Sequence, residues 1–134
     1  MSAKRKGTNA ELELLHMFWD NGFIAMRAPG SGVIKYPCPD LLAGNAMRKL
    51  AIECKATGSD KRYISSEQIE NLKRFSRIFG AEPWVAVRFN KTARNREGWF
   101  FISMDDLRET KGSNYVITME LAQARGLLFG EIIK

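Results

Sequence analysis

The chain has 134 residues, of which 45% are hydrophobic and 27% charged, a composition typical of one globular domain. Its net charge of +6 favours a polyanionic partner, nucleic acid before an acidic membrane, although solubility alone explains the charge equally well. No apolar run is long enough to span a bilayer, and no apolar stretch follows the basic start. A cytoplasmic protein with no membrane partner is therefore expected.

The cysteine and histidine content argues against two kinds of chemistry. The chain has two cysteines, Cys38 and Cys54, and one histidine, His16. Zinc sites usually need four ligands from closely spaced Cys and His pairs. Serine–histidine or cysteine–histidine catalysis would depend on His16, which lies in a helical pattern with no nucleophile nearby. Neither chemistry is expected.

A first helix is predicted over residues 9–21, after a flexible basic N-terminus of residues 1–8. Thr8 and Glu11 have the spacing of a capping box at the helix start. Glu11 also falls on the apolar stripe of the helix. Spacing alone favours the capping role, and a carboxylate aimed at a site beneath the helix is the alternative.

Three strand patterns follow this helix. Alternation over 23–27 places Arg27 on the same face as two apolar side chains. A loop rich in glycine and proline comes next. Further strands are predicted from near Asp40 and over 49–55, joined by a turn at Gly44 and its neighbouring asparagine.

A second helix has clear signals at both ends. Ser65 and Gln68 form a capping-box pattern, and Gly80 suits the position after the last turn. Gln68 lies at the edge of the apolar stripe, toward the sheet. The predicted buried stripe consists of Ile69, Leu72, Phe75 and Phe79.

The remaining patterns complete the predicted fold. Strands are predicted over 84–89 and 99–103, with a basic loop between them. A strand near 115–118 and a helix near 120–125 follow. The order α-β-β-β-α-β-β predicts one α/β domain over 1–134, with a mixed five-stranded sheet flanked by helices.

Two carboxylates and an ammonium lie where an apolar core is expected. Asp40 heads the second strand, while Glu53 and Lys55 share one face of the third, about 7 Å apart by the strand rise. Phosphodiester hydrolysis needs an activated water and neutralised charge, which a divalent metal supplies. Mg²⁺ prefers oxygen ligands, so both carboxylates and the Cys54 carbonyl suit it. Lys55 would then contact the scissile phosphate or the attacking water. A solvated strand face with an ion pair is the alternative.

Several segments that together span most of the chain match one known family. They are "KRKGTNAELEL", "GFIAMRAPGSG", "PDLLAG", "AIECK" and "YISSEQIENLKRFSRIFGAEPWVAVRF". The chain resembles the archaeal Holliday junction resolvase family, Hjc, within the PD-(D/E)xK nuclease superfamily. The resemblance implies metal-associated acids at Glu11, Asp40 and Glu53, a catalytic lysine at Lys55 and a functional serine at Ser31.

The resemblance implies a restriction-endonuclease-like core that cuts four-way DNA junctions with Mg²⁺, or with Mn²⁺ as a substitute. The Ser31 hydroxyl would bind the phosphate or position the reacting group, unless it serves only as a turn residue. A supporting role is expected for Gln68. Contacts to the DNA backbone, which weaken with salt, are expected from Lys4, Arg5, Lys6, Arg27, Lys61 and Arg62.

A junction with two-fold symmetry favours a homodimer with two identical sites. The apolar segments "WFFI" and "GLLFGEII" would form either this interface or ordinary core. Two other functions stay open. One is a nuclease of the same core that acts on duplex or flap DNA. The other is a catalytically silent DNA-binding subunit, against which the three retained charges argue. A nucleoid-associated location is expected for the resolvase.

Overall fold

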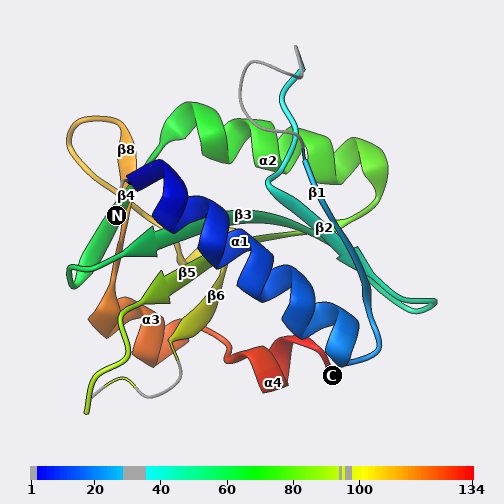
Figure 1. Ribbon diagram of the computed structural model, residues 1–134. Helices are drawn as coiled ribbons and strands as arrows, with labels where there is room; N and C mark the ends of the chain where they lie inside the picture. The colour runs from blue at the N-terminus through cyan, green and yellow to red at the C-terminus, as the bar shows by residue number, and fades with distance from the viewer. Residues whose placement is uncertain (1–2, 29–35, 94, 96–97) are drawn as a thin grey trace.

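A mixed sheet of five strands forms the centre of the protein. The computed structural model describes residues 3–28, 36–93, 95 and 98–134. The strand order is β1-β2-β3-β5-β6, in which only β3 and β5 are parallel neighbours, so the predicted mixed sheet is confirmed (Figure 1). The strands are β1 (Ile24–Arg27), β2 (Leu41–Gly44), β3 (Lys49–Thr57), β5 (Glu82–Phe89) and β6 (Trp99–Ser103).

Helices cover both faces of this sheet. The helices are α1 (Ala3–Asp20), α2 (Ser66–Phe79), α3 (Met119–Arg125) and α4 (Phe129–Ile132). Helices α1 and α4 pack on one face, while α2 and α3 pack on the other, so two hydrophobic clusters sandwich the sheet (Figure 1). Successive side chains of β3 point to opposite faces, and for that reason Ala51 joins the α2 cluster while Leu50 and Ile52 join the α1 cluster. None of the helices in the described ranges is long and apolar enough to cross a membrane.

A second, smaller sheet lies beside α2 and was only partly predicted. It has the order β4-β8-β7, with β4 (Lys61–Ser65), β7 (Arg108–Glu109) and β8 (Asn114–Thr118). A short 3₁₀ helix, η1 (Met104–Asp106), precedes β7. Strand β4 escaped prediction because only Ile64 in it is buried, which leaves no alternating pattern in the sequence.

Helix α1 begins earlier than predicted. It starts at Ala3 rather than at Asn9, so Thr8 lies inside the helix and the predicted capping box at this position is wrong. Residues 3–6 are alanine, lysine and arginine, which are strong helix formers, and the cost of Gly7 is only about 1 kcal/mol. Residues 3–8 are therefore helical instead of forming a flexible arm.

Helix α2 agrees with the prediction at both ends. The Ser65 hydroxyl accepts from the Gln68 backbone, the Gln68 side chain accepts from the Ser65 backbone, and Gly80 has a φ of 85°. The predicted burial of Phe79 is wrong, since its exposed fraction is 52%. Ser76 is the buried residue in the last part of the stripe instead.

The two apolar segments considered for an interface pack within the chain itself. All four residues of 99–102 are buried in β6. In the C-terminal segment Ile132 is fully buried, and Leu127, Phe129 and Ile133 pack against the α1 cluster. Leu127 also pairs with Phe101 as an isolated bridge beside β6. Both segments therefore contribute to the core of the single chain.

Among the glycines of the C-terminal segment, Gly126, directly after α3, has the least space for a side chain. A Cβ at this position would lie 2.6 Å from the Ala122 carbonyl oxygen and 2.9 Å from Ile102 Cδ1. Its φ of −72° suits any residue, so space alone requires glycine. We expect Gly126→Ala to lower the free energy of unfolding by about 2 kcal/mol because of this overpacking. Urea denaturation measures the effect. Gly130→Ala is the matched control, since a Cβ there would meet nothing within 4 Å.

Candidate active site

The site forms where one edge of β3 has no neighbouring strand. Strand β2 pairs with β3 only as far as Leu41 opposite Ile52, whereas β5 stays paired with β3 to its end. Beyond Ile52, the Asp40 side chain takes the place of the missing strand, and its Oδ2 accepts a hydrogen bond of 2.8 Å from the Cys54 backbone. The N–H and C=O of one strand residue face the same edge, so the Cys54 carbonyl also points into this opening.

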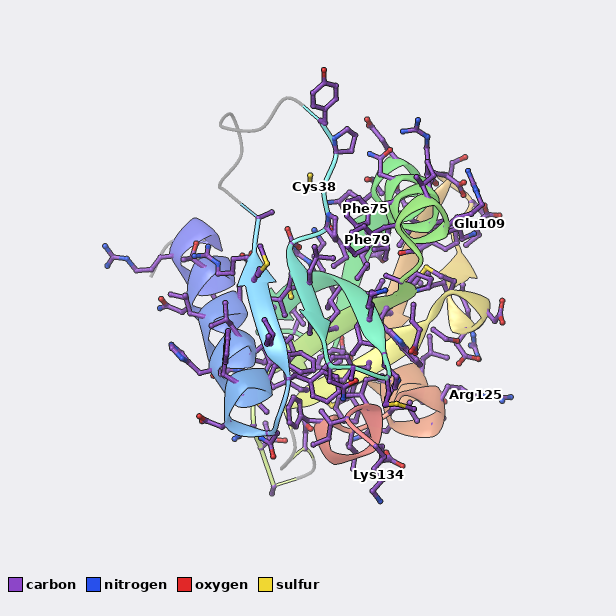
Figure 2. All side chains as sticks on the ribbon, turned by 90° about the vertical axis from the view of Figure 1, so that its right-hand side faces the viewer. Cys38, Phe75, Phe79, Glu109, Arg125 and Lys134 are labelled. Atoms are coloured by element: carbon purple, nitrogen blue, oxygen red, sulfur yellow. The ribbon has the colours of Figure 1, made fainter. Side chains whose placement is uncertain are left out.

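A cavity of about 530 Å³ occupies the opening. Its walls come from the N-terminal half of α1, the end of β1, residues 36–40, β3, β4 and the start of α2. Figure 2 shows Cys38, one of its lining residues, at one end of the molecule beside α2. The predicted site residues among the cavity walls are Lys6, Glu11, Arg27, Asp40, Glu53, Lys55, Arg62 and Gln68.

Glu11 reaches the cavity from the helix on the opposite face of the sheet. Ala10, Leu14 and Phe18 bury the inner side of α1 and fix its rotation. Glu11 then lies at the opening, and its Oε1 accepts from Arg27 Nε at 3.2 Å. Arg27, expected from the sequence to contact DNA, therefore also pairs with a carboxylate of the site.

Glu53 is held by residues from β3 and α2. Its side chain is almost buried, and its Oε2 accepts a hydrogen bond of 3.3 Å from Gln68 Nε2. Lys55 Nζ lies 4.0 Å from the same oxygen. Because the other end of the Gln68 amide accepts from Ser65, the helix cap itself orients the partner of Glu53. This geometry gives a structural basis for the supporting role expected of Gln68.

The carboxylates of the cavity resist ionisation in the absence of a cation. Burial raises the pKa of Glu53 to about 8, with a further contribution from the negative charge of Asp40, while Lys55 opposes the shift. Burial likewise raises the pKa of Asp40, against the lowering effects of the Cys54 N–H and of nearby Lys55. Burial and the charge of Asp40 raise the pKa of Glu11 as well.

These observations fit a divalent cation. Two carboxylates whose pKa values are both raised by burial, next to a backbone carbonyl, provide the hard oxygen donors that Mg²⁺ prefers. Within the described ranges, no three His, Cys, Asp or Glu side chains are grouped closely enough to hold a metal ion. An ion here would therefore use Asp40 and Glu53 with backbone and water oxygens, as Mg²⁺ commonly does.

Not every predicted residue reaches the cavity. Lys61 lies outside its walls, and its Nζ is 5.9 Å from the centroid of the Tyr63 ring. Arg5 is exposed and also lies outside the cavity walls. Ser31 and the side chain of Lys4 are outside the described part of the chain.

Three polar residues of the cavity were missed by the sequence analysis. They are Thr8, Tyr36 and Asn71. Asn71 lies one turn after Gln68 on α2, so helical spacing from Gln68 would have identified it. No periodic pattern in the sequence around Tyr36 indicates where its side chain lies.

Comparisons with known proteins agree with this architecture. A family model described as archaeal Holliday junction resolvase (hjc) matches residues 2–134. A protein of Archaeoglobus fulgidus named crossover junction endodeoxyribonuclease Hjc is 39% identical over 134 residues, covering 96% of this chain and 95% of the relative. The Hjc protein of Methanocaldococcus jannaschii is 37% identical over 129 residues, covering 96% and 87%.

A solved structure shows the same fold. The structure of Archaeoglobus fulgidus Hjc, titled as a Holliday junction resolvase, matches with a TM-score of 0.83 and 37% sequence identity. The match covers 96% of this chain and 100% of the other. With a family model that spans nearly all residues and relatives well above 30% identity, this chain belongs to the archaeal Holliday junction resolvase family.

Proposed function

We propose that the protein is a metal-dependent endonuclease that resolves four-way DNA junctions by hydrolysing two phosphodiester bonds. The observation that carries the proposal is the convergence of Asp40, Glu53 and Lys55 on one cavity. The relatives named above as crossover junction endodeoxyribonucleases support it. A cytoplasmic, nucleoid-associated location would follow from this action on DNA junctions.

Asp40, Glu53 and the Cys54 carbonyl would hold Mg²⁺, which supplies an activated water and neutralises charge on the phosphate. Lys55, whose side chain is 13% exposed, donates from its ammonium to the scissile phosphate or to the attacking water. Gln68 keeps the Glu53 carboxylate in place through its hydrogen bond. Glu11 adds a third carboxylate on the α1 side, and Arg27 limits its charge. Ser31 is proposed to contact the phosphate.

Cleavage assays separate this function from its alternatives. The purified protein is incubated with a labelled four-way junction and with a linear duplex of the same sequence, in Mg²⁺ or in EDTA. Symmetric paired nicks in the junction alone, and only with metal, support a resolvase. Equal cutting of the linear duplex would indicate a general nuclease, and tight junction binding without cutting would indicate a silent binding subunit.

An exposed apolar surface suits the homodimer that paired cutting requires. Met26 pairs with Leu42 across β1 and β2, and paired residues point to the same face, so Met26 faces the α2 side of the sheet. Met26 is 62% exposed, and on α2 the side chains of Ile78 and Phe79 are 69% and 52% exposed. A small cavity of about 120 Å³, lined partly by Phe75 and Ile78, lies in this region. Exposed apolar side chains of this size favour contact with another protein surface.

We expect Ile78→Asp to convert the dimer into a monomer, because burying an unpaired carboxylate in an interface is costly. Sedimentation velocity measures the change. Glu70→Gln is the matched control on the same helix, since its exposed carboxylate lies next to Lys73 rather than among the apolar side chains. A variant Ile78→Asp that sediments like the wild-type dimer would exclude this surface.

A further inference from the structure

Two cations of the cavity have no partner in the described part of the chain. Arg27 and Lys55 each lie beside a glutamate. No hydrogen bond or ion pair from any described residue reaches the side chains of Lys6 or Arg62, although both line the cavity. The Nε of Arg62 is buried and unsatisfied. A buried N–H without an acceptor is destabilising, so this guanidinium is arranged for an acceptor that the described residues do not provide.

Both cations lie at the same end of β3. Thr57, the last residue of β3, donates its hydroxyl to the Lys61 carbonyl at 3.2 Å, which fixes Arg62 beside the end of that strand. Lys6 approaches from α1, because a Cβ at Gly58 would lie 3.2 Å from the Lys6 Nζ. Lys6 on α1 and Arg62 on β4 therefore both lie near the end of β3, past the position of Lys55.

This placement leaves room for a second phosphate beside the reacting one. The strand rises by about 7 Å over the two residues from Lys55 to Thr57. A DNA strand advances about 3.4 Å along its axis per nucleotide, so the interval corresponds to one or two nucleotides. Guanidinium groups bind phosphate oxygens through two parallel hydrogen bonds, and a lysine adds a point charge.

We propose that Lys6 and Arg62 form a second phosphate subsite. It binds one backbone phosphate of the cut strand, one or two nucleotides from the scissile phosphate, and thereby sets the position of the cut. The proposal rests on the proposed nuclease function and extends it from the reacting phosphate to a defined neighbour. Unlike a diffuse basic surface, such a subsite reads a single position in the strand.

The test combines protein variants with neutral phosphate analogues. Wild-type cut sites are first mapped on a four-way junction. Junctions then carry one methylphosphonate at the first or second phosphate on either side of the cut. Binding is measured in EDTA for the wild type and for Lys6→Gln, Arg62→Gln and Arg62→Lys, and cleavage positions are mapped in Mg²⁺.

On the unmodified junction, Arg62→Gln is expected to weaken binding about tenfold, as for the loss of a charged hydrogen bond. Lys6→Gln should act in the same direction, and Arg62→Lys should recover part of the loss. When the methylphosphonate replaces the phosphate that the subsite binds, the glutamine variants and the wild type should bind the junction equally well. At the other positions the wild type should still bind more tightly than the glutamine variants. Cleavage by Arg62→Gln should spread to adjacent nucleotides.

Arg125→Gln is the charge-matched control, because Arg125 is exposed on α3 at the end of the molecule away from Cys38 (Figure 2). An equal loss from Arg125→Gln, or a loss from Arg62→Gln that no single methylphosphonate removes, would overturn the subsite. A wild-type protein that neither binds nor cuts the junction would overturn the nuclease function itself. Thermal unfolding confirms that each variant is folded.

Discussion

Replacing Asp40 with asparagine is expected to lower the rate of junction cleavage by at least about a thousandfold, because a charged metal ligand at the reacting centre is lost. Asparagine preserves the shape of the side chain, and its amide oxygen can still accept from the Cys54 N–H. Alanine would leave that buried N–H without an acceptor, so Asp40→Asn is the cleaner variant. Single-turnover cleavage in Mg²⁺ measures the rate.

Junction binding in EDTA should stay within about threefold of the wild type, because one carboxylate adds nothing favourable to phosphate affinity without metal. Asp105→Asn is the control, since Asp105 is an exposed residue of η1 outside the cavity walls. Cleavage by Asp40→Asn within tenfold of the wild type would remove this carboxylate from the catalytic centre.

The second large effect concerns stability. Because the pKa of Glu53 is raised to about 8 in the fold from 4.5, the unfolded chain releases the proton at lower pH than the native protein does. The metal-free protein should therefore lose stability as the pH rises from about 4.5 to 8, by at most about 5 kcal/mol from this group. Glu53→Gln should remove this loss and be more stable than the wild type at pH 8.

Urea denaturation in EDTA at several pH values measures this effect. Burial also raises the pKa values of Asp40 and Glu11, so any pH dependence of stability that persists in Glu53→Gln is attributed to these two groups. Mg²⁺ at pH 8 should stabilise the wild type more than Glu53→Gln. Glu70→Gln, an exposed site on α2, should follow the wild type at every pH. A variant Glu53→Gln that is less stable than the wild type at pH 8 would refute the charge burial.

The raised pKa values and the proposed activity have one origin. A site that holds acids close together in a buried opening destabilises the free protein and favours a bound cation. Such a conflict between stability and activity is common at functional sites. In the same opening the buried Nε of Arg62 has no acceptor among the described residues, so the acidic and the basic parts of the cavity both lack partners there.

The sequence predicted those local features of the fold that depend only on nearby residues. The cap at Ser65, the glycine after α2 and the strand 99–103 were predicted at their observed positions. These features result from hydrogen bonds and burial within a few residues. Prediction failed at other elements. At Thr8 the capping pattern suggested a helix start, whereas the helix-forming residues before it extend α1 to Ala3. Strand β4 was missed because only one of its residues is buried.

The sequence by itself determined the residue types of the site and its family resemblance, because motif spacing within single strands and helices needs no tertiary information. Only the tertiary structure decided that Arg27 pairs with Glu11 and that Asp40 closes the free edge of β3. It also decided that the side chains of Lys6 and Arg62 line the cavity without a partner among the residues that the structure describes. Such contacts join elements far apart in the chain. They depend on where β2 ends relative to β3 and on how α1 and α2 meet across the sheet, which no local pattern encodes.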